Sequence, residues 1–199
     1  EDARTAFEEA RRQQPDELAP LLGLGDSYVA LRAYGDAAAI YTFAAERDPA
    51  TPAPYLGLAT IYLATGHPDD ALVACQEALG RDPEAPAGHA GLGDAYFALQ
   101  RLDEGSRAYQ RALELDPAYA PAHRGLARIF YREGRYQEAR TAYERANDHD
   151  PHTTPDRYLG AIYQALGLYK SAVAAYRASL PAAPEDYALT SGLGDALLA

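Results

Sequence analysis

The stretch GLGDAYFALQ, from Gly91 to Gln100, decides the fold because its opening letters return elsewhere in the chain. GLGDSYVALR begins at Gly23 and GLGDALLA begins at Gly192. The intervals of 68 and 101 residues are twice 34, and one residue short of three times 34. Glycines ahead of an acidic residue resemble a phosphate-binding turn, but such a turn normally occurs once and follows a strand. A phrase that returns on a fixed period indicates a repeat architecture instead.

Proline marks the same period. Five prolines are spaced by 34 residues and a sixth follows after 33: Pro15, Pro49, Pro83, Pro117, Pro151 and Pro184. Asp precedes each of the four members of this series from Pro49 to Pro151. Because proline disfavours helix at the residue that precedes it, each Asp–Pro pair predicts the end of a helix and a turn.

Apolar residues between the prolines recur at helical spacing. Leu21, Leu24 and Tyr28 lie three or four residues apart, the segment AYGD interrupts the pattern, and a second face begins at Ala37. Each period therefore predicts two helices of roughly 12–14 residues joined by a short turn. Neither helix can bury its apolar face alone, so we expect an all-α fold of stacked antiparallel helix pairs, about twelve helices in all.

The residues within each period resemble the tetratricopeptide repeat. That pattern has a large residue, Leu, a small residue and Tyr on the first helix, then Ala, an aromatic residue, Ala and Pro on the second. The first full repeat supplies Leu21, Leu24, Gly25, Tyr28, Ala37, Tyr41, Ala44 and Pro49, and the third supplies His89, Leu92, Gly93, Tyr96, Gly105, Tyr109, Ala112 and Pro117. The resemblance covers essentially the whole chain and implies a right-handed α-solenoid. It also implies that Gly25 and Gly93 allow paired helices to approach closely.

The resemblance divides the chain into a single array. Five full repeats are expected over residues 18–51, 52–85, 86–119, 120–153 and 154–186, with a lone second helix over 1–17 and a lone first helix over 187–199. Repeat arrays usually carry polar caps at their ends, and neither end has that character. We therefore expect the array to be a segment of a longer protein.

Composition disfavours several classes of function. The net charge of −11 disfavours nucleic-acid binding, which needs a basic surplus. No apolar run approaches the ~20 residues of a membrane span, so we predict no membrane insertion. Cys75, the single cysteine, stands at a buried repeat position where we expect an inert thiol. No nucleophile, base and orienting group fall on a recognisable motif, so we predict neither an enzyme nor a cofactor.

The histidines offer one possible metal site. His149 and His152 flank Asp150, and both residue types bind zinc, but proline interrupts the segment and no further ligand has a fixed position. We therefore predict no metal site. His89 and His123 occupy equivalent positions one repeat apart, and we expect each to pack with one ring nitrogen hydrogen-bonded.

In the resembled family, the first helices line a concave groove that typically holds a segment of another protein. The resemblance therefore implies a non-enzymatic scaffold that binds a peptide or helical segment of a protein partner. The first three repeats offer mainly apolar side chains to this groove, with two carboxylates: Leu22, Leu56, Leu63, Phe97, Asp26 and Asp94. We expect this half to accept an apolar helix or strand, unless neighbouring first helices curl inward and cover these side chains.

The fourth and fifth repeats give the groove a basic character. Residues 120–160 contain seven Arg and six Asp or Glu, whereas the remainder of the sequence has 11 basic and 23 acidic residues. The expected partner-contacting residues of this half are Arg124, Arg128, Tyr131, Arg132 and Arg157. Three of these arginines are spaced i, i+4, i+8, which places them along one helix face. Guanidinium groups bind carboxylates and phosphates in a bidentate way, so we expect an acidic peptide, the terminal carboxylate of a partner or a phosphorylated segment.

Three alternatives stay open at this point. The arginines could be neutralised within the protein by Asp94, Glu133 or Asp156, which would make them an ordinary solvated face. Exposed repeat ends could stack copies of the protein into oligomers or fibres. The array could also be a regulatory or targeting domain of a larger enzyme.

Overall fold

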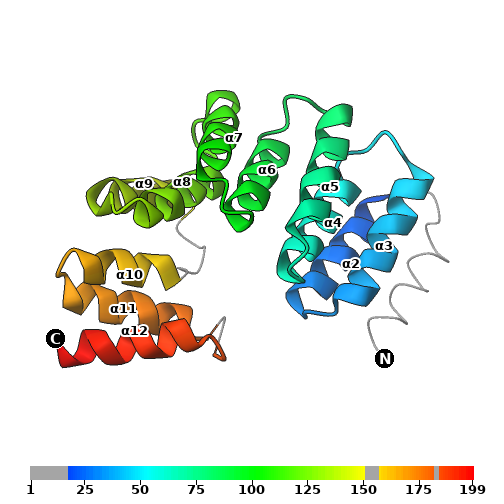
Figure 1. Ribbon diagram of the computed structural model, residues 1–199. Helices are drawn as coiled ribbons and strands as arrows, with labels where there is room; N and C mark the ends of the chain where they lie inside the picture. Colours follow the sequence, from blue (N-terminus) through cyan, green and yellow to red (C-terminus); the bar gives the residue numbers. More distant parts are fainter. Residues whose placement is uncertain (1–17, 151–156, 182–183) are drawn as a thin grey trace. The chain divides into compact units, whose positions relative to one another are not determined.

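The structure is a computed structural model that describes residues 18–150, 157–181 and 184–199. These residues form eleven helices and no strands, which confirms the all-α helical repeat fold (Figure 1). The helix expected over residues 1–17 lies outside the described ranges. The chain divides between Leu115 and Asp116 into two compact units.

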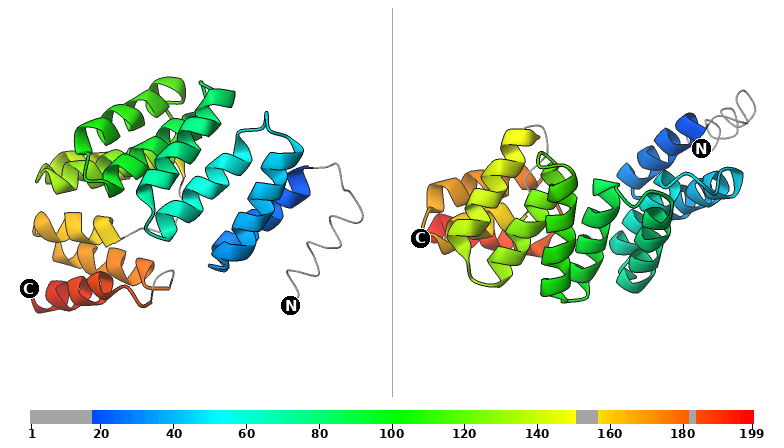
Figure 2. Two further views of the ribbon diagram at one scale, coloured as in Figure 1. Left: turned by 45° about the vertical axis from the view of Figure 1, so that its right-hand side comes forward. Right: turned by 90° about the horizontal axis from the view of Figure 1, so that it is seen from above.

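Residues 18–115 of the first unit contain three helix pairs. The pairs are α2 (Leu18–Ala30) with α3 (Tyr34–Arg47), α4 (Ala53–Ala64) with α5 (Pro68–Arg81), and α6 (Pro86–Ala98) with α7 (Leu102–Leu115). The helices of a pair pack against each other across a three-residue turn, so they run antiparallel. Successive pairs are stacked because α3 packs on α4 and α5 packs on α6 (Figure 2).

The second unit repeats this arrangement. Its helices are α8 (Ala120–Arg132), α9 (Tyr136–His149), α10 (Arg157–Ala165), α11 (Tyr169–Ser179) and α12 (Tyr187–Leu198). Helix α8 pairs with α9 and α10 pairs with α11, while α12 packs against both α10 and α11. First helices therefore follow one another in space as well as in sequence: α2, α4 and α6 in the first unit, and α8, α10 and α12 in the second.

The turn within each pair reverses the backbone on one residue with a left-handed conformation. Its middle residue has a positive φ in all five described pairs: Arg32 (59°), Gly66 (79°), Gln100 (61°), Gly134 (76°) and Gly167 (72°). Glycine adopts this conformation without steric cost, whereas for a residue with a Cβ atom it costs roughly 1–2 kcal/mol. Glycine stands at three of the five turns because it adopts the positive φ that the turn requires.

The turns between pairs explain the repeated Asp–Pro. In the three of these turns that the structure describes, the Asp carboxylate accepts a hydrogen bond from the backbone N–H two residues later, at 3.0 Å for Asp48, 3.1 Å for Asp82 and 2.9 Å for Asp116. Such an Asx turn stabilises the chain reversal while proline prevents the helix from continuing.

The proline carbonyl of these turns is held by a side chain from a neighbouring helix. Nε2 of His89 lies 2.9 Å from the carbonyl oxygen of Pro83, and Nε2 of His123 lies 3.0 Å from that of Pro117. A carbonyl only accepts, so Nε2 is the donor in both rings. In the remaining described turn, Nε of Arg81 donates to Pro49 at 2.6 Å. The expectation that both histidines pack with one hydrogen-bonded nitrogen is confirmed.

Glycines on the first helices accommodate the aromatic ring of the second helix. A Cβ atom built at Gly25 would lie 2.7 Å from the ring of Tyr41, and one at Gly93 would lie 2.5 Å from the ring of Tyr109. Real Cβ atoms essentially never approach another heavy atom within 3.0 Å. The close approach of paired helices that the repeat pattern implies at these two positions is therefore confirmed.

This packing generates a matched test of stability. Gly93→Ala should lower the urea midpoint of unfolding, because the new methyl group meets the Tyr109 ring and such overpacking costs about 1–3 kcal/mol. Gly80→Ala on α5 is the control: a Cβ there has no neighbour within 4 Å, and helix propensity alone should stabilise it by up to about 1 kcal/mol. Circular dichroism in urea measures both midpoints, and a Gly93→Ala protein as stable as Gly80→Ala would contradict the close-packing account.

Candidate partner-binding surface

The expected partner-contacting residues all lie on first helices, but they differ in how far they reach solvent. Leu22, Leu56, Leu63 and Phe97 are half-buried. Leu22 packs against the core around Leu21, and Leu63 packs against the core around Cys75. Leu22 and Leu63 therefore help to hold the stack together, and the contact of all four apolar side chains with a partner stays a prediction.

The two carboxylates expected in the groove are hydrogen-bonded to the core tyrosines of their own repeats. The hydroxyl of Tyr41 donates to Asp26 at 2.6 Å, and the hydroxyl of Tyr109 donates to Asp94 at 2.7 Å. Burial, together with the hydrogen bond to the Asp26 carboxylate, raises the pKa of Tyr41. Both acids thus have a structural role, whatever else they contact.

Each residue of the GLGD segment in α6 packs against, or forms a hydrogen bond with, another part of the fold. A Cβ at Gly91 would lie 2.7 Å from the sulfur of Cys75, and one at Gly93 would meet Tyr109. Leu92 packs against the core around Cys75, and Asp94 accepts the hydrogen bond of Tyr109. Helix packing alone therefore accounts for the phrase that resembles a phosphate turn.

Helix α8 carries Arg124, Arg128 and Arg132, which we call the Arg stripe. The nearest Arg124–Asp150 ion-pair atoms are 4.0 Å apart, and Arg132 is exposed at the end of the helix. Glu133, one of the acids that could neutralise the stripe, forms an ion pair of 2.8 Å with Arg135. Asp156, the second such acid, lies outside the described residues.

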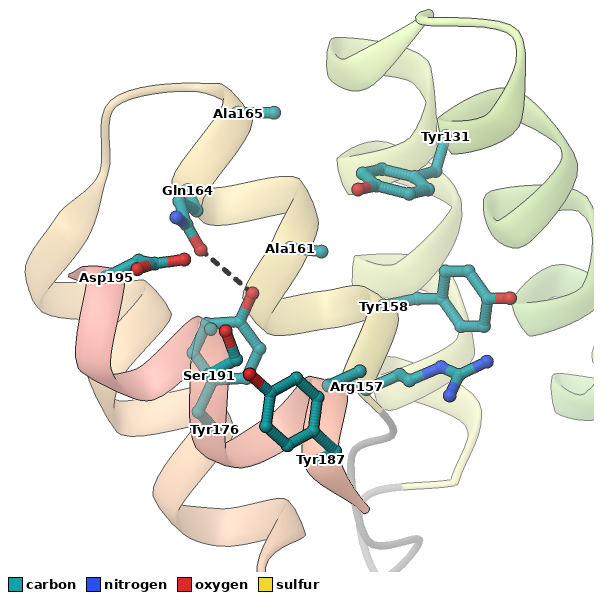
Figure 3. Close-up of a pocket in the computed structure, with 12 residues that line it drawn as sticks. Tyr131, Arg157, Tyr158, Ala161, Gln164, Ala165, Tyr176, Tyr187, Ser191 and Asp195 are labelled. Carbon is teal, nitrogen blue, oxygen red and sulfur yellow. Dashed lines mark hydrogen bonds between the residues drawn. The ribbon is translucent and has the colours of Figure 1, made fainter.

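A pocket of about 620 Å³ opens among the first helices of the second unit (Figure 3). We call it the Tyr pocket, and its lining is Tyr131, Arg157, Tyr158, Ala161, Gln164, Ala165, Tyr176, Tyr187, Ala188, Ser191, Gly192 and Asp195. All of these residues except Tyr176, which comes from α11, belong to α8, α10 or α12. The pocket brings together two residues of the expected surface, Tyr131 and Arg157, which lie on different helices.

Aromatic contacts fix the walls of the Tyr pocket. The ring centroids of Tyr131 and Tyr158 are 5.7 Å apart with their planes at 73°, an edge-to-face arrangement. The guanidinium carbon of Arg157 lies 5.3 Å from the Tyr158 ring centre, and Nη1 of Arg157 donates to Asp186 at 3.3 Å. The electronegative ring faces and the polar groups of this pocket suit a ligand that carries charge or hydrogen-bond donors.

Tyr176 closes the floor of the Tyr pocket. Its hydroxyl donates to the side-chain oxygen of Gln164 at 3.0 Å, as Figure 3 shows. Burial raises the pKa of Tyr176 to about 12, and the nearby Tyr131 and Asp195 add to the shift. Burial likewise raises the pKa of Tyr131. Both phenols therefore stay neutral hydrogen-bonding groups at physiological pH.

Sequence models described as Tetratricopeptide repeat match residues 28–75, 56–105, 91–152 and 159–186. The chain belongs to the tetratricopeptide repeat family. Members of this family are typically non-enzymatic scaffolds for protein–protein interaction. No curated protein matches this sequence.

Solved structures of other tetratricopeptide repeat (TPR) proteins have the same fold. TTC0263, a thermophilic TPR protein of Thermus thermophilus, is 26% identical with a TM-score of 0.76, over 92% of this chain and 100% of that one. MamA is 25% identical with a TM-score of 0.54, over 79% of this chain and 93% of that one. One protein of the APC/C hetero-tetramer Cut9–Hcn1 is 16% identical with a TM-score of 0.83, over 99% of this chain and 39% of that one.

The tetratricopeptide pattern does not predict several lining residues of the Tyr pocket, among them Tyr158, Tyr187 and Asp195. One signal was available for Tyr158, because every other first helix has glycine at that repeat position: Gly23, Gly57, Gly91, Gly125 and Gly192. Asp195 corresponds to Asp94 in the phrase GLGD. Tyr187 is 82% exposed and has no distinguishing pattern.

His123 and His149 stack with ring centroids 5.6 Å apart, whereas His152 lies outside the described residues. Within the described ranges, no group of three or more His, Cys, Asp or Glu side chains is arranged to hold a metal ion. None of the helices described is both long and apolar enough to cross a membrane.

Cys75 gives a test that depends on pH. Burial raises the pKa of this thiol from 9.0 to about 12, with a smaller contribution from Asp94. At pH 8 the folded protein should therefore react with iodoacetamide about a thousandfold more slowly than the urea-unfolded protein, because only the thiolate attacks. Between pH 9 and pH 12 the thiol ionises in the unfolded protein and stays protonated in the folded protein. The free energy of unfolding therefore falls as pH rises through this range. Mass spectrometry follows the labelling, and equal rates at pH 8 would show that Cys75 is accessible.

Proposed function

We propose that this tetratricopeptide array is a scaffold that binds a segment of a partner protein along its first helices. The Tyr pocket is the observation that carries this proposal. It is formed by three successive first helices, α8, α10 and α12, and it is large enough for a side chain with its flanking backbone. Tyrosines, which are enriched in protein interfaces, supply much of its lining.

The Arg stripe supplies the charged part of the proposed surface. Like charges one helical turn apart cost a few tenths of a kcal/mol per pair, so α8 gains no stability from the series itself. The Arg124–Asp150 separation of 4.0 Å is at the limit of an ion pair, and partly exposed pairs contribute only about 0–1 kcal/mol. Carboxylates or phosphates of a partner could therefore compete for these guanidinium groups.

In the first unit, the half-buried residues Leu22, Leu56, Leu63 and Phe97 would offer apolar contacts to a partner segment. One similar structure, YrrB, is described as a TPR protein with an unusual peptide-binding site; it is 19% identical with a TM-score of 0.54, over 94% of this chain and 96% of that one. At that identity the similarity is one of fold, so the proposal rests on the residues of this chain.

The test of the Arg stripe uses a fluorescent deca-glutamate peptide and measures its anisotropy at low and high salt. Replacing all three arginines by alanine should weaken binding at least about tenfold, and salt should weaken binding to the native protein. The control is Arg145→Ala with Arg177→Ala, which removes two arginines from second helices. If the triple variant loses thermal stability, Arg132→Ala alone, at an exposed position, replaces it. Equal binding by native and variant proteins of equal stability would leave the stripe without a recognition role.

A second candidate function is self-association through the end of the second unit. A hollow of about 730 Å³ is lined by residues of α11 and α12 and the turn before α11. Leu168 and Leu197 in this lining are 40% and 57% exposed, and the neighbouring Leu198, the last residue of α12, is 91% exposed. Apolar surface of this kind often marks a contact site.

Light scattering over a range of concentrations tests this second candidate. The mass of the native protein should rise with concentration, whereas a Leu197→Ser/Leu198→Ser protein should stay a monomer because the apolar contact is lost. Leu31→Ser is the control, since Leu31 is 71% exposed in the first unit. A native protein that remains monomeric at the highest concentration would exclude self-association.

A further inference from the structure

Three tyrosines from three successive first helices surround the Tyr pocket. Tyr131 comes from α8, Tyr158 from α10 and Tyr187 from α12 (Figure 3). The first two rings hold each other edge to face, and Tyr187 is 82% exposed at the solvent side. Aromatic rings carry negative potential on their faces, so rings arranged around one space attract a cation into it.

The carboxylate of Asp195 adds a negative charge to the same lining. Asp195 is exposed on α12 and makes no hydrogen bond or ion pair with any residue that the structure describes. Its negative charge contributes to the raised pKa of the Tyr176 phenol. A cation in the pocket would therefore meet a carboxylate that has no competing partner among those residues.

Arg157 is the one basic residue of the lining, and its charge is already compensated. Its guanidinium group donates to the Asp186 carboxylate at 3.3 Å and lies over the Tyr158 ring. Figure 3 shows Arg157 and Asp195 at opposite ends of the pocket. Asp195 is thus the one charged residue of the lining that has no hydrogen-bond or ion-pair partner among the described residues.

We propose that the Tyr pocket binds a cationic side chain, arginine or lysine, of the partner segment. The proposal rests on the proposed function, since it names the chemistry of one side chain in the segment that the array binds. The partner segment would then be of mixed charge, with acidic groups at the Arg stripe and a basic residue held between Tyr131, Tyr158 and Tyr187. An anionic side chain is disfavoured in the pocket, because it would face both Asp195 and the aromatic ring faces.

The test compares two probes that differ in charge and hardly in shape: N-acetyl-arginine amide and its neutral isostere, N-acetyl-citrulline amide. Chemical shifts of ¹³C-labelled tyrosine rings in the whole protein report binding. The arginine probe should shift the ring signals of Tyr131, Tyr158 and Tyr187 and should bind at least about fivefold more tightly than the citrulline probe. Equal affinity of the two probes, or no shift at these three rings, would overturn the proposal.

Variants assign the preference to particular side chains. Asp195→Asn should reduce the preference for the arginine probe at least about twofold, because the carboxylate is lost and only the ring faces still favour the cation. Tyr187→Leu should weaken the arginine probe at least about threefold, and both positions are exposed, so the fold is kept. The controls are Asp148→Asn on α9 and Tyr169→Leu on α11, exposed positions outside the pocket lining. An Asp195→Asn protein that keeps the native preference would contradict the role of this carboxylate.

The two experiments distinguish failure of the cation site in the Tyr pocket from failure of the scaffold proposal. The single-residue probe reports only on the Tyr pocket, whereas the deca-glutamate peptide reports on the Arg stripe. Binding of the acidic peptide without a preference for the arginine probe would overturn the cation site and leave the scaffold standing. A charge preference without acidic-peptide binding would support the pocket and remove the stripe.

Discussion

In the first and fifth repeats, an aromatic ring of the second helix packs against glycines of two consecutive first helices, and the spacing of those helices depends on this contact. Tyr176 shows the full arrangement: Cβ atoms at Gly160 on α10 and at Gly192 on α12 would lie 2.5 Å and 2.6 Å from it. The ring thereby sets the distance between consecutive first helices. Since those helices carry the Tyr pocket, the glycines that admit the ring also determine how wide the pocket is. In one repeat the ring is absent, and Cys75 fills the same place against Gly91.

The fold could be predicted from the sequence because its information is local and repeated. Asp–Pro pairs mark the ends of second helices, and the apolar spacing marks which face of each helix is buried. Five or six copies of the same pattern average out departures such as Cys75 or His89. The structure adds the physical reasons: the Asx turns at Asp48 and Asp82, and the left-handed residue in the middle of every described intra-pair turn.

The candidate site was predictable only in part, because repeat position gives the face of a helix and not the direction of a side chain. Tyr131 and Arg157 were expected and do line the pocket. The pattern does not predict a surface role for Tyr158, because the other first helices have glycine at this position, and at Gly57, Gly91 and Gly192 that glycine packs against a second-helix side chain. The hydrogen bonds of Tyr41 to Asp26 and of Tyr109 to Asp94 join residues 15 apart in sequence on different helices, so no periodic pattern reveals them.

Those hydrogen bonds link the packing of the core to the chemistry of the proposed binding surface. A tyrosine that is buried on the second helix ends in a hydroxyl bonded to an acid on the first-helix surface, so core and surface share an interaction. Replacing Asp26 or Asp94 to alter what the surface recognises also removes the hydrogen-bond acceptor of a part-buried phenol. The resulting change in the free energy of unfolding will not be additive with that of a substitution at the bonded tyrosine. Thr60, the equivalent residue on α4, bonds only to the backbone of its own helix, and the second-helix residue of its repeat is Cys75. Recognition can therefore diversify at Thr60 with less loss of stability than at the two acids.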